Sequence, residues 1–547
     1  MIERIITSQA KSITYASFIL FTCFLLSAFL GLLRDRFLAG TFGAGDELDV
    51  YYSAFIIPDF FALIFIFGAI SVAVVPIFSF YFLKSEKEAW NYFSFFFNIF
   101  LGILIFVCTL MAILAPFVVS LVAPGFPEFK KELTVSLMRI MFLSPIILGI
   151  SNIISGVLQF FHRFLATALA PIMYNVGIII GILFLYPLFG LKGLAWGVVL
   201  GGIFHLLIQI PAFLACKPQY HFGFNYQHPG IVKTLKLMIP RSIGLGAYQI
   251  NRWIITAIAS TLSGGSIAVF NLANNLSSFL MNAIAFSLST ALFPTLSLAF
   301  LQADEKRLVE KFFLAFRQLI FMAIPLSVLF IILRAQIVRV VLGAGKFGWL
   351  DTRLTTACLG ILVLSICGQA LILILAKTFY ATSNTFIPAL VTIGTVIVNI
   401  FLSFGLVFLI QSSPSFYLFL QALLRLENIK DIGVIGLAIA FSFSTLLESF
   451  ILLFLLSKRI PLWKHLRDFG LSFLKIIFVS GIMGIFVFLT RNFIGAFFTL
   501  STFWEVFCQL IISGLVGVIT FVIFCYLMKI EEIKRIFDFL KGIFFFR

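Results

Sequence analysis

The chain has 547 residues, of which 62% are hydrophobic and 11% charged, and its mean hydropathy is +1.15. Soluble domains are about half apolar and a quarter charged, so this composition excludes an ordinary soluble protein and predicts an all-α, polytopic membrane protein. The formal charge of +16 comes from Lys and Arg scattered through short connections, which excludes nucleic acid as the partner and favours membrane lipids with an anionic inner face.

About twenty apolar residues are needed to cross a bilayer, and fourteen such segments follow one another along the chain. They lie near residues 13–33, 50–82, 91–115, 134–158, 165–188, 193–215, 232–258, 267–299, 309–333, 356–380, 386–411, 432–457, 468–490 and 502–528. The first is too long for a cleavable signal and lacks a small-residue cleavage site, so we expect it to remain. With the N-terminus inside, more Lys and Arg fall on the inner side, which predicts that both termini are cytoplasmic. The connection from Arg334 to Arg353 is an exception to this bias.

Two pairs of segments repeat at nearly the same separation. "VAVVPIFSFYFL" around Pro76 matches "TALFPTLSLAFL" around Pro294, and "ALAPIMYN" around Pro171 matches "TFIPALVT" around Pro388. The shared offset predicts two six-helix bundles in the same orientation, a pseudo-two-fold repeat typical of transporters that work by alternating access. We therefore expect an N-terminal bundle over 1–229, a C-terminal bundle over 230–460, and two appended spans with a basic cytoplasmic tail over 461–547.

Charged side chains within or at the edges of the predicted spans are costly and should face a cavity or a partner. They are Arg34, Asp49, Asp59, Arg139, Arg241, Arg252 and Glu448. For Arg34 and Asp35 the alternative is that both are interfacial and reach water. Our interpretation is that Arg34 faces a cavity while Asp35 and Arg36 are interfacial.

The seventh span, 232–258, carries a polar stripe. Arg241 and Arg252 fall within roughly 20° of one helix face at about 100° per residue, and Gln249 and Asn251 lie beside Arg252. Guanidinium groups bind phosphate through paired hydrogen bonds, so this stripe predicts an anionic substrate.

The sequence does not indicate a phosphate loop, a disulfide, a metal site or an enzyme active site. The glycines of "GTFGAG" follow a hydrophobic helix without the strand and Lys-Ser/Thr of a phosphate loop, so we expect a turn there. The seven cysteines lie singly, mostly within apolar runs, and indicate neither a disulfide nor a metal site. No nucleophile, base and orienting group occur together, so we do not expect an enzyme.

Several motifs carry a resemblance to a known family. They are "SAFLGLLRDRFLAGTFGAGDELDVYYSAFIIPDFFALIFIFGAISVAVVPIFSFY" (27–81), "APGF" (123–126), "RFLATALAPIMYN" (163–175), "AWGVVLGGIFHLLIQIP" (195–211), "FPTLS" (293–297) and "FYATSNTFIP" (379–388). In this order they resemble the MurJ/MviN family, the lipid II flippases of the multidrug/oligosaccharidyl-lipid/polysaccharide exporter superfamily, and fourteen spans is also that family's number.

The resemblance implies a cavity between the two bundles that holds the diphosphate-linked headgroup, while the undecaprenyl tail stays in lipid. Arg34 and Asp49 match an arginine and an aspartate of the family's motif. Other positions depart from the family's charged residues: Ala28, Ala62, Leu63, Phe67, Asn274 and Asn275. We interpret Arg241 and Arg252 as restoring the charge lost at Ala62 and Asn275, with Asn275 still lining the substrate site.

The resemblance also implies sodium as a coupling ion, and Asn399 and Ser403, one helical turn apart, are its candidate ligands, with packing hydrogen bonds as the alternative. We expect no other cofactor. The leading hypothesis is a monomeric flippase for lipid II in the bacterial cytoplasmic membrane. The alternatives are an exporter of another lipid-linked oligosaccharide, a transport-inactive scaffold of a cell-wall complex and, less favoured because it would use acidic cavity residues and twelve spans, a multidrug antiporter.

Overall fold

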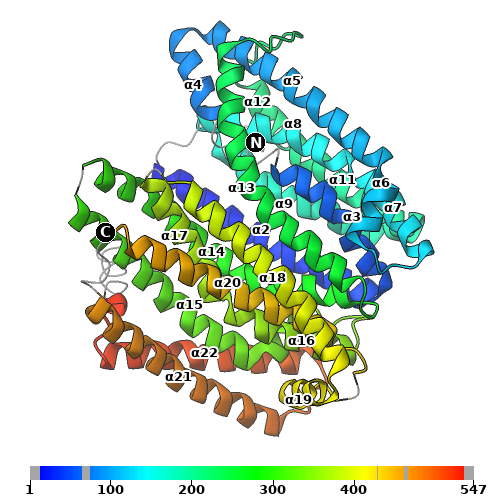
Figure 1. Ribbon diagram of the computed structural model, residues 1–547, viewed down its shortest axis with the longest axis vertical. Helices are drawn as coiled ribbons and strands as arrows, with labels where there is room; N and C mark the ends of the chain where they lie inside the picture. Colours follow the sequence, from blue (N-terminus) through cyan, green and yellow to red (C-terminus); the bar gives the residue numbers. More distant parts are fainter. Residues whose placement is uncertain are drawn as a thin grey trace. The chain divides into compact units, whose positions relative to one another are not determined.

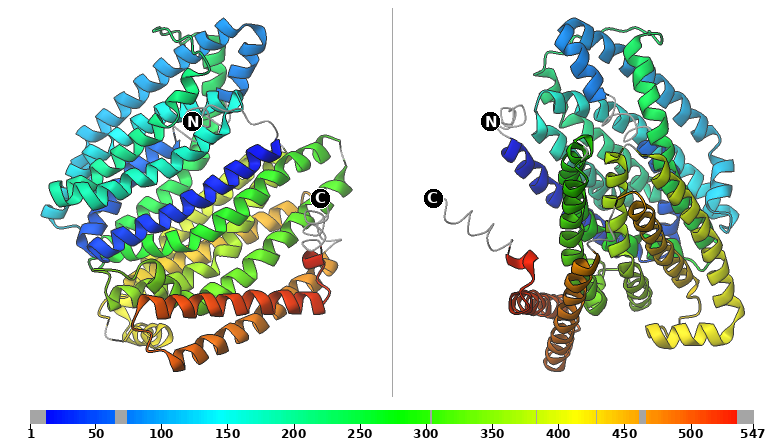
Figure 2. Two further views of the ribbon diagram at one scale, coloured as in Figure 1. Left: turned by 180° about the vertical axis from the view of Figure 1, so that it is seen from behind. Right: turned by 60° about the vertical axis from the view of Figure 1, so that its left-hand side comes forward.

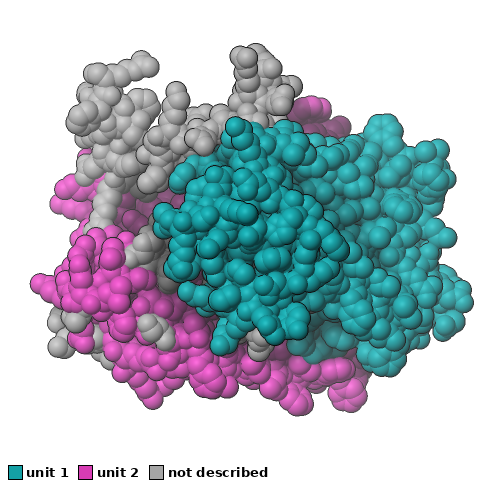
Figure 3. Space-filling model, turned by 90° about the horizontal axis from the view of Figure 1, so that it is seen from above, with its two compact units in different colours: residues 1–268 teal, residues 269–547 magenta. Residues whose placement is uncertain are grey.

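The computed structural model describes residues 13–64, 74–302, 304–382, 384–427, 429–460 and 466–534. These residues form α-helices joined by short connections and contain no strand, which confirms the all-α prediction (Figure 1). They divide into two compact units, 1–268 and 269–547 (Figure 3).

Unit 1 contains the first twelve described helices and the start of a thirteenth, α14. They are α2 (Ile13–Phe42), α3 (Asp46–Ala62), α4 (Val75–Lys84), α5 (Glu86–Ile113), α6 (Ala115–Val122), α7 (Glu128–Met141), α8 (Leu143–Phe160), α9 (Phe164–Ile180), α10 (Tyr186–Phe189), α11 (Leu191–Leu207), α12 (Ile210–Leu214), α13 (Pro229–Ala259) and α14 (Ser266–Leu301). A π-helical segment, Gly181–Leu185, joins α9 to α10.

Unit 2 contains the rest of α14 and eight further helices. They are α15 (Glu305–Val341), α16 (Trp349–Leu364), α17 (Ile366–Ala381), α18 (Phe386–Ser412), α19 (Pro414–Leu424), α20 (Gly433–Ser457), α21 (Leu466–Phe497) and α22 (Phe503–Leu527). The appended helices α21 and α22 lie side by side and pack against α15 (Figure 2).

The fourteen predicted spans fall on these helices, apart from residues 65–73, which lie outside the described part. Nine described helices are long and apolar enough to cross a membrane, and α16 with α17, bent by 40°, makes ten if the pair is one span. The count of fourteen therefore remains a prediction.

Helix α13, which contains the seventh predicted span, packs on α3, α5 and α6. By these contacts it belongs to unit 1, which ends at residue 268, whereas the sequence repeat predicts that the N-terminal bundle ends at residue 229. The repeat itself remains a prediction.

Glycines allow α9 and α11 to approach closely. A Cβ atom on Gly177 would lie 2.3 Å from the Cα of Gly201, and one on Gly181 would lie 2.5 Å from the Cα of Gly197. Lipid tails are as apolar as the helix surface, so the hydrophobic effect contributes little to helix association in a membrane. Close backbone packing at small residues is therefore a main source of helix–helix attraction there. Asn175 lies on α9, so this close helix packing holds its backbone in place.

Local caps explain where several helices begin. Asp304 accepts a hydrogen bond from the backbone N–H of Arg307 at the start of α15. Thr502 and Glu505 form a reciprocal capping box at the start of α22, since each side chain accepts a hydrogen bond from the other residue's backbone N–H. Such caps satisfy N–H groups that have no partner inside the helix.

Candidate functional site

The charged motif that follows the first predicted span lies inside a helix. Helix α2 continues through Arg34, Asp35 and Arg36 as far as Phe42, so these charges do not mark the end of the helix. The side chain of Arg34 is 24% exposed, whereas that of Asp35 is 4% exposed. The expectation that Asp35 is an interfacial group was therefore wrong, because its carboxylate is buried against the neighbouring guanidinium.

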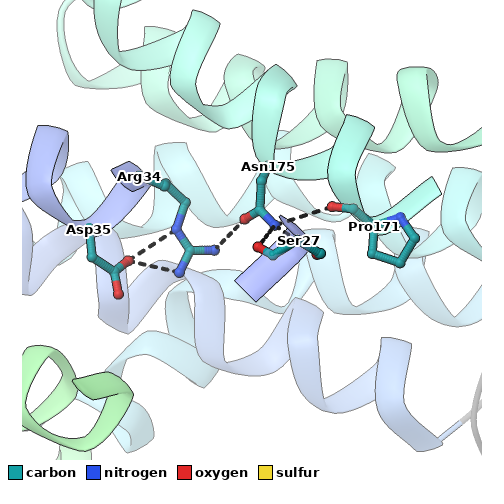
Figure 4. Close-up of polar contacts among 5 residues, drawn as sticks. All are labelled: Ser27, Arg34, Asp35, Pro171 and Asn175. Carbon is teal, nitrogen blue, oxygen red and sulfur yellow. Dashed lines mark hydrogen bonds and ion pairs between the residues drawn. The ribbon is translucent and has the colours of Figure 1, made fainter. Parts of the chain in front are cut away.

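The Arg34 guanidinium is held by an acid and an amide (Figure 4). Its Nε and Nη2 donate to Oδ1 of Asp35 at 3.0 and 2.8 Å, and its Nη1 donates to Oδ1 of Asn175 on α9 at 3.2 Å. Asn175 in turn donates through Nδ2 to the Ser27 carbonyl and hydroxyl at 3.4 Å and to the Pro171 carbonyl at 3.1 Å. Helices α2 and α9 thus fix the direction in which Arg34 points.

A second ion pair joins α13 to α3. Arg252 donates from Nη1 to Oδ2 of Asp59 at 3.1 Å, and the two side chains are 34% and 27% exposed. Asp59 belongs to the segment "PDFFAL", in which Ala62 and Leu63 stand where the family resemblance implies arginines. Part of the charge of Arg252 is therefore neutralised by Asp59.

Two tyrosines lie near these ion pairs. Tyr52 is within electrostatic range of both pairs, and its buried hydroxyl has no hydrogen-bond partner among the described residues. Tyr174 is within electrostatic range of Arg34 and Asp59. We call this group the polar cluster; its members are Arg34, Asp35, Tyr52, Asp59, Tyr174, Asn175 and Arg252.

Asp49 has a different environment. It is 2% exposed, and its two carboxylate oxygens accept hydrogen bonds from the backbone N–H groups of Gly265, at 2.7 Å, and Ala268, at 2.8 Å. These groups lie at the N-terminus of α14, where an anion is favoured by free N–H groups and the helix dipole. Gly265 is required there, since its φ is +91° and a Cβ would overlap the Ala44 carbonyl oxygen. A structural role accounts for this buried carboxylate without a substrate.

The remaining candidates on α13 and α14 are only partly described. Gln249 and Asn251 are 4% and 7% exposed, and Oδ1 of Asn251 has no hydrogen-bond partner in the described part of the chain. Asn275 is half-buried in the part of α14 that belongs to unit 2. The side chain of Arg241 lies outside the described residues, so the polar stripe on α13 is observed only from Gln249 onward.

The candidate ion ligands lie in unit 2. The Ser403 hydroxyl is 3.3 Å from Oδ1 of Asn399 and donates to it, and both residues are buried. On the same helix, Thr392 and Thr395 donate to the carboxylate of Glu448 at 2.6 and 3.3 Å. In the described segments, no group of three or more His, Cys, Asp or Glu side chains is placed to hold a metal ion.

Sequence reasoning did not identify every member of the polar cluster. Asp59 was recognised as a membrane charge, but its pairing with Arg252 depends on how α13 packs on α3. Asn175 closes a motif already singled out for its family likeness, and a buried amide in an apolar helix is a signal for a polar partner. Tyr52 and Tyr174 gave no such signal, because tyrosine is common in membrane helices.

Comparisons with known proteins extend the sequence resemblance over most of the chain. A family model described as "Lipid II flippase MurJ" matches residues 38–508. The probable lipid II flippase MurJ of Buchnera aphidicola subsp. Acyrthosiphon pisum is 30% identical over 398 residues, which cover 71% of this chain and 77% of that protein.

Two solved structures bear on the fold. A lipid II flippase MurJ in an inward closed conformation matches with a TM-score of 0.74 and 26% identity, covering 93% of this chain and 98% of that chain. An inward-facing multidrug resistance MATE family transporter of the MOP superfamily matches with a TM-score of 0.64 and 16% identity, covering 80% of this chain and 95% of that chain. The second likeness shows the fold alone.

Proposed function

This chain belongs to the lipid II flippase MurJ family, and we propose that it carries lipid II across the cytoplasmic membrane by alternating access. It is a multi-pass protein of the bacterial inner membrane. We further propose that it acts as a monomer, with both termini in the cytoplasm, and that it moves its substrate without covalent chemistry.

The observation that carries this proposal is the preorganised guanidinium of Arg34. The hydrogen bonds to Asp35 and Asn175 use one N–H of Nε, one of Nη1 and one of Nη2. One N–H on each terminal nitrogen is left for a ligand, and this fork matches two oxygens of a phosphate group. Because the side chain is 24% exposed, a diphosphate can reach it without unfolding of the helix.

Arg252 supplies a second cation whose carboxylate partner is partly exposed. Exchanging Asp59 for a phosphate oxygen would cost little, since exposed ion pairs contribute about 0–1 kcal/mol. We propose that Arg34 and Arg252 contact the diphosphate and that Gln249, Asn251 and Asn275 contact the headgroup. For Arg241 we keep the same proposal on the sequence alone. For Asp49 we propose that it stabilises the start of α14.

The test is rescue of growth in a bacterium depleted of its own lipid II flippase. We expect the wild-type chain to restore growth and Arg34→Ala to fail, with equal amounts of both proteins in the membrane. Arg139→Ala is the matched control, because Arg139 is exposed and donates to the Ala112 carbonyl rather than to the polar cluster. Full rescue by Arg34→Ala would refute the assigned role. Failure of the wild type would count against lipid II as the substrate.

Reconstituted vesicles separate the substrates. Translocation of lipid II but not of another undecaprenyl-diphosphate saccharide would support the proposal, and the reverse would favour an exporter of that saccharide. Retention of cell-wall protein partners with no translocation of either substrate would favour a scaffold.

We also propose Na⁺ as the coupling ion at Asn399 and Ser403. Translocation should then require Na⁺ and respond to Ser403→Ala; Na⁺-independent translocation would exclude it.

A further inference from the structure

A cavity of about 740 Å³ lies at one end of unit 2, and several of the side chains that line it are positively charged. It is bounded by the C-terminal turns of α15, α19 and α21 and by the N-terminal turns of α16 and α22, whose ends can be followed in Figure 1. Its lining includes five arginines: Arg334, Arg339, Arg353, Arg425 and Arg491. Among the described residues, no acidic side chain lines it. The polar cluster lies in unit 1, so this is a separate site.

Four of the five guanidinium groups are fixed by neutral backbone carbonyls. Arg334 donates to Ile331 (3.0 Å), Arg339 to Leu500 (2.8 Å), Arg491 to Ile332 (2.9 Å), and Arg353 to Arg425 and Glu427. A carbonyl orients a guanidinium but leaves its charge in place. Each of these arginines also has more N–H donors than these bonds use.

The five arginines have no ion-pair partner among the described residues. Besides their burial, Arg334 is close enough to Arg425 to be repelled by it, and Arg491 is close enough to be repelled by Arg334 and Arg425. The acidic groups next along the chain serve helix starts: Asp351 accepts from the Gly348 N–H, and Glu505 caps α22.

Two further polar groups of the lining lack partners in the described structure. Oε1 of Gln336 and Oγ1 of Thr356 are buried and accept or donate no hydrogen bond there. Gln336 is 9% exposed, and its Nε2 donates to Gln509 at 3.0 Å, so the amide is held with its oxygen free. A buried polar atom without a partner costs about 1–3 kcal/mol, which a ligand would recover.

We propose that this cavity binds the phosphate group of an anionic phospholipid headgroup. Gathering five like charges without a counter-charge is unfavourable unless an anion occupies the site, and guanidinium pairs match phosphate oxygens. The oxygen of Gln336 would accept from a headgroup hydroxyl, and the Thr356 hydroxyl would donate to a phosphate oxygen.

The position of the cavity favours a lipid over a free anion. It lies at the ends of α15, α21 and α22, which are long and apolar enough to cross a membrane, and lipid headgroups lie at the ends of such helices. Apolar residues share its lining, among them Phe488 and Val506, and Trp349 beside them is 64% exposed. The proposal also explains why the connection from Arg334 to Arg353 departs from the charge bias of the other connections: these arginines form a binding site.

The test measures lipid retained by the full-length protein purified in detergent. The probes are dioleoyl-phosphatidylglycerol, dioleoyl-phosphatidylcholine and inorganic phosphate, each titrated and detected by native mass spectrometry. The variants are Arg425→Gln and the double variant Arg334→Gln/Arg425→Gln. Arg425 is exposed, so its change to Gln leaves the packing intact. The matched control is Arg459→Gln. Arg459 is exposed and follows the C-terminus of α20, whereas Arg425 precedes the N-terminus of the same helix.

We expect phosphatidylglycerol to bind the wild type and the control equally, and more tightly than phosphatidylcholine. The double variant should bind it about ten-fold more weakly or worse, since each charge-assisted hydrogen bond contributes about a ten-fold factor. Binding of phosphate alone, weakened by the same variants, would retain the anion site and assign it a soluble ligand. Equal binding of every probe by wild type and both variants would overturn the proposal, as would an equal loss in Arg459→Gln. This measurement does not involve translocation, so the result for lipid binding is independent of the proposed transport function.

Discussion

The assignment of Asp49 to structure rather than to substrate gives the sharpest prediction. Replacing Asp49 by Asn keeps the size of the side chain but removes its charge and turns one acceptor oxygen into a donor. One of the N–H groups of Gly265 and Ala268 then loses its acceptor inside the protein. A hydrogen bond to a charged group contributes about 1.5–3 kcal/mol, and the helix dipole adds about 0.3–1 kcal/mol. We expect Asp49→Asn to destabilise unit 1 by about 2–4 kcal/mol.

The assay is thermal unfolding of the purified protein at one fixed scan rate, followed by tryptophan fluorescence. A fixed rate is needed because such unfolding is governed by kinetics. At roughly 2–4 °C per kcal/mol, the midpoint should fall by roughly 4–16 °C. The matched control is Glu47→Gln in the same helical turn. Glu47 is half-buried and takes part in no ion pair among the described residues, so we expect its change to destabilise the protein by about 1 kcal/mol or less.

Two results would refute this reasoning. If Glu47→Gln lowered the midpoint as much as Asp49→Asn, the buried hydrogen bonds to the start of α14 would not be the cause. If Asp49→Asn kept the wild-type midpoint yet abolished rescue of growth, Asp49 would act on the substrate, as the family resemblance implied.

Three further predictions concern packing and the polar cluster. Gly177→Ala should destabilise unit 1 by about 1–3 kcal/mol, because the added Cβ would overlap α11. The control is Gly394→Ala, whose Cβ would meet nothing within 4 Å and should leave the thermal midpoint unchanged or raised. Equal midpoints for the two variants would contradict the close packing of α9 and α11. Arg252→Ala should destabilise the protein by only about 1 kcal/mol or less, while it weakens rescue of growth. If Arg252 contacts the substrate, the reversed pair Arg252→Asp/Asp59→Arg should not restore rescue. Arg34→Lys should be inactive in the rescue assay at normal membrane levels, since an ammonium lacks the planar fork; full activity would show that only the charge is needed.

Much of the fold follows from local sequence. Apolar runs of the right length placed the membrane helices, because a segment in lipid must satisfy its own backbone hydrogen bonds and only a helix does so within one segment. The motif around Arg34 was also sufficient to indicate the family. The breaks within spans were not predicted, such as the bend between α16 and α17 near Ser365, since hydropathy does not report on helix direction.

Partners distant in sequence were decided only by the tertiary structure. Arg34 meets Asn175, and Asp49 meets the start of α14, because particular helices pack together, and hydropathy carries no record of which faces meet. The same holds for the arginines between Arg334 and Arg491, which look like scattered surface charges along the chain and gather around one cavity in unit 2. The sequence by itself determined that this is a helical membrane transporter of a known family. Packing decided which of its charges are paired, which serve the fold, and which remain available to bind a phosphate.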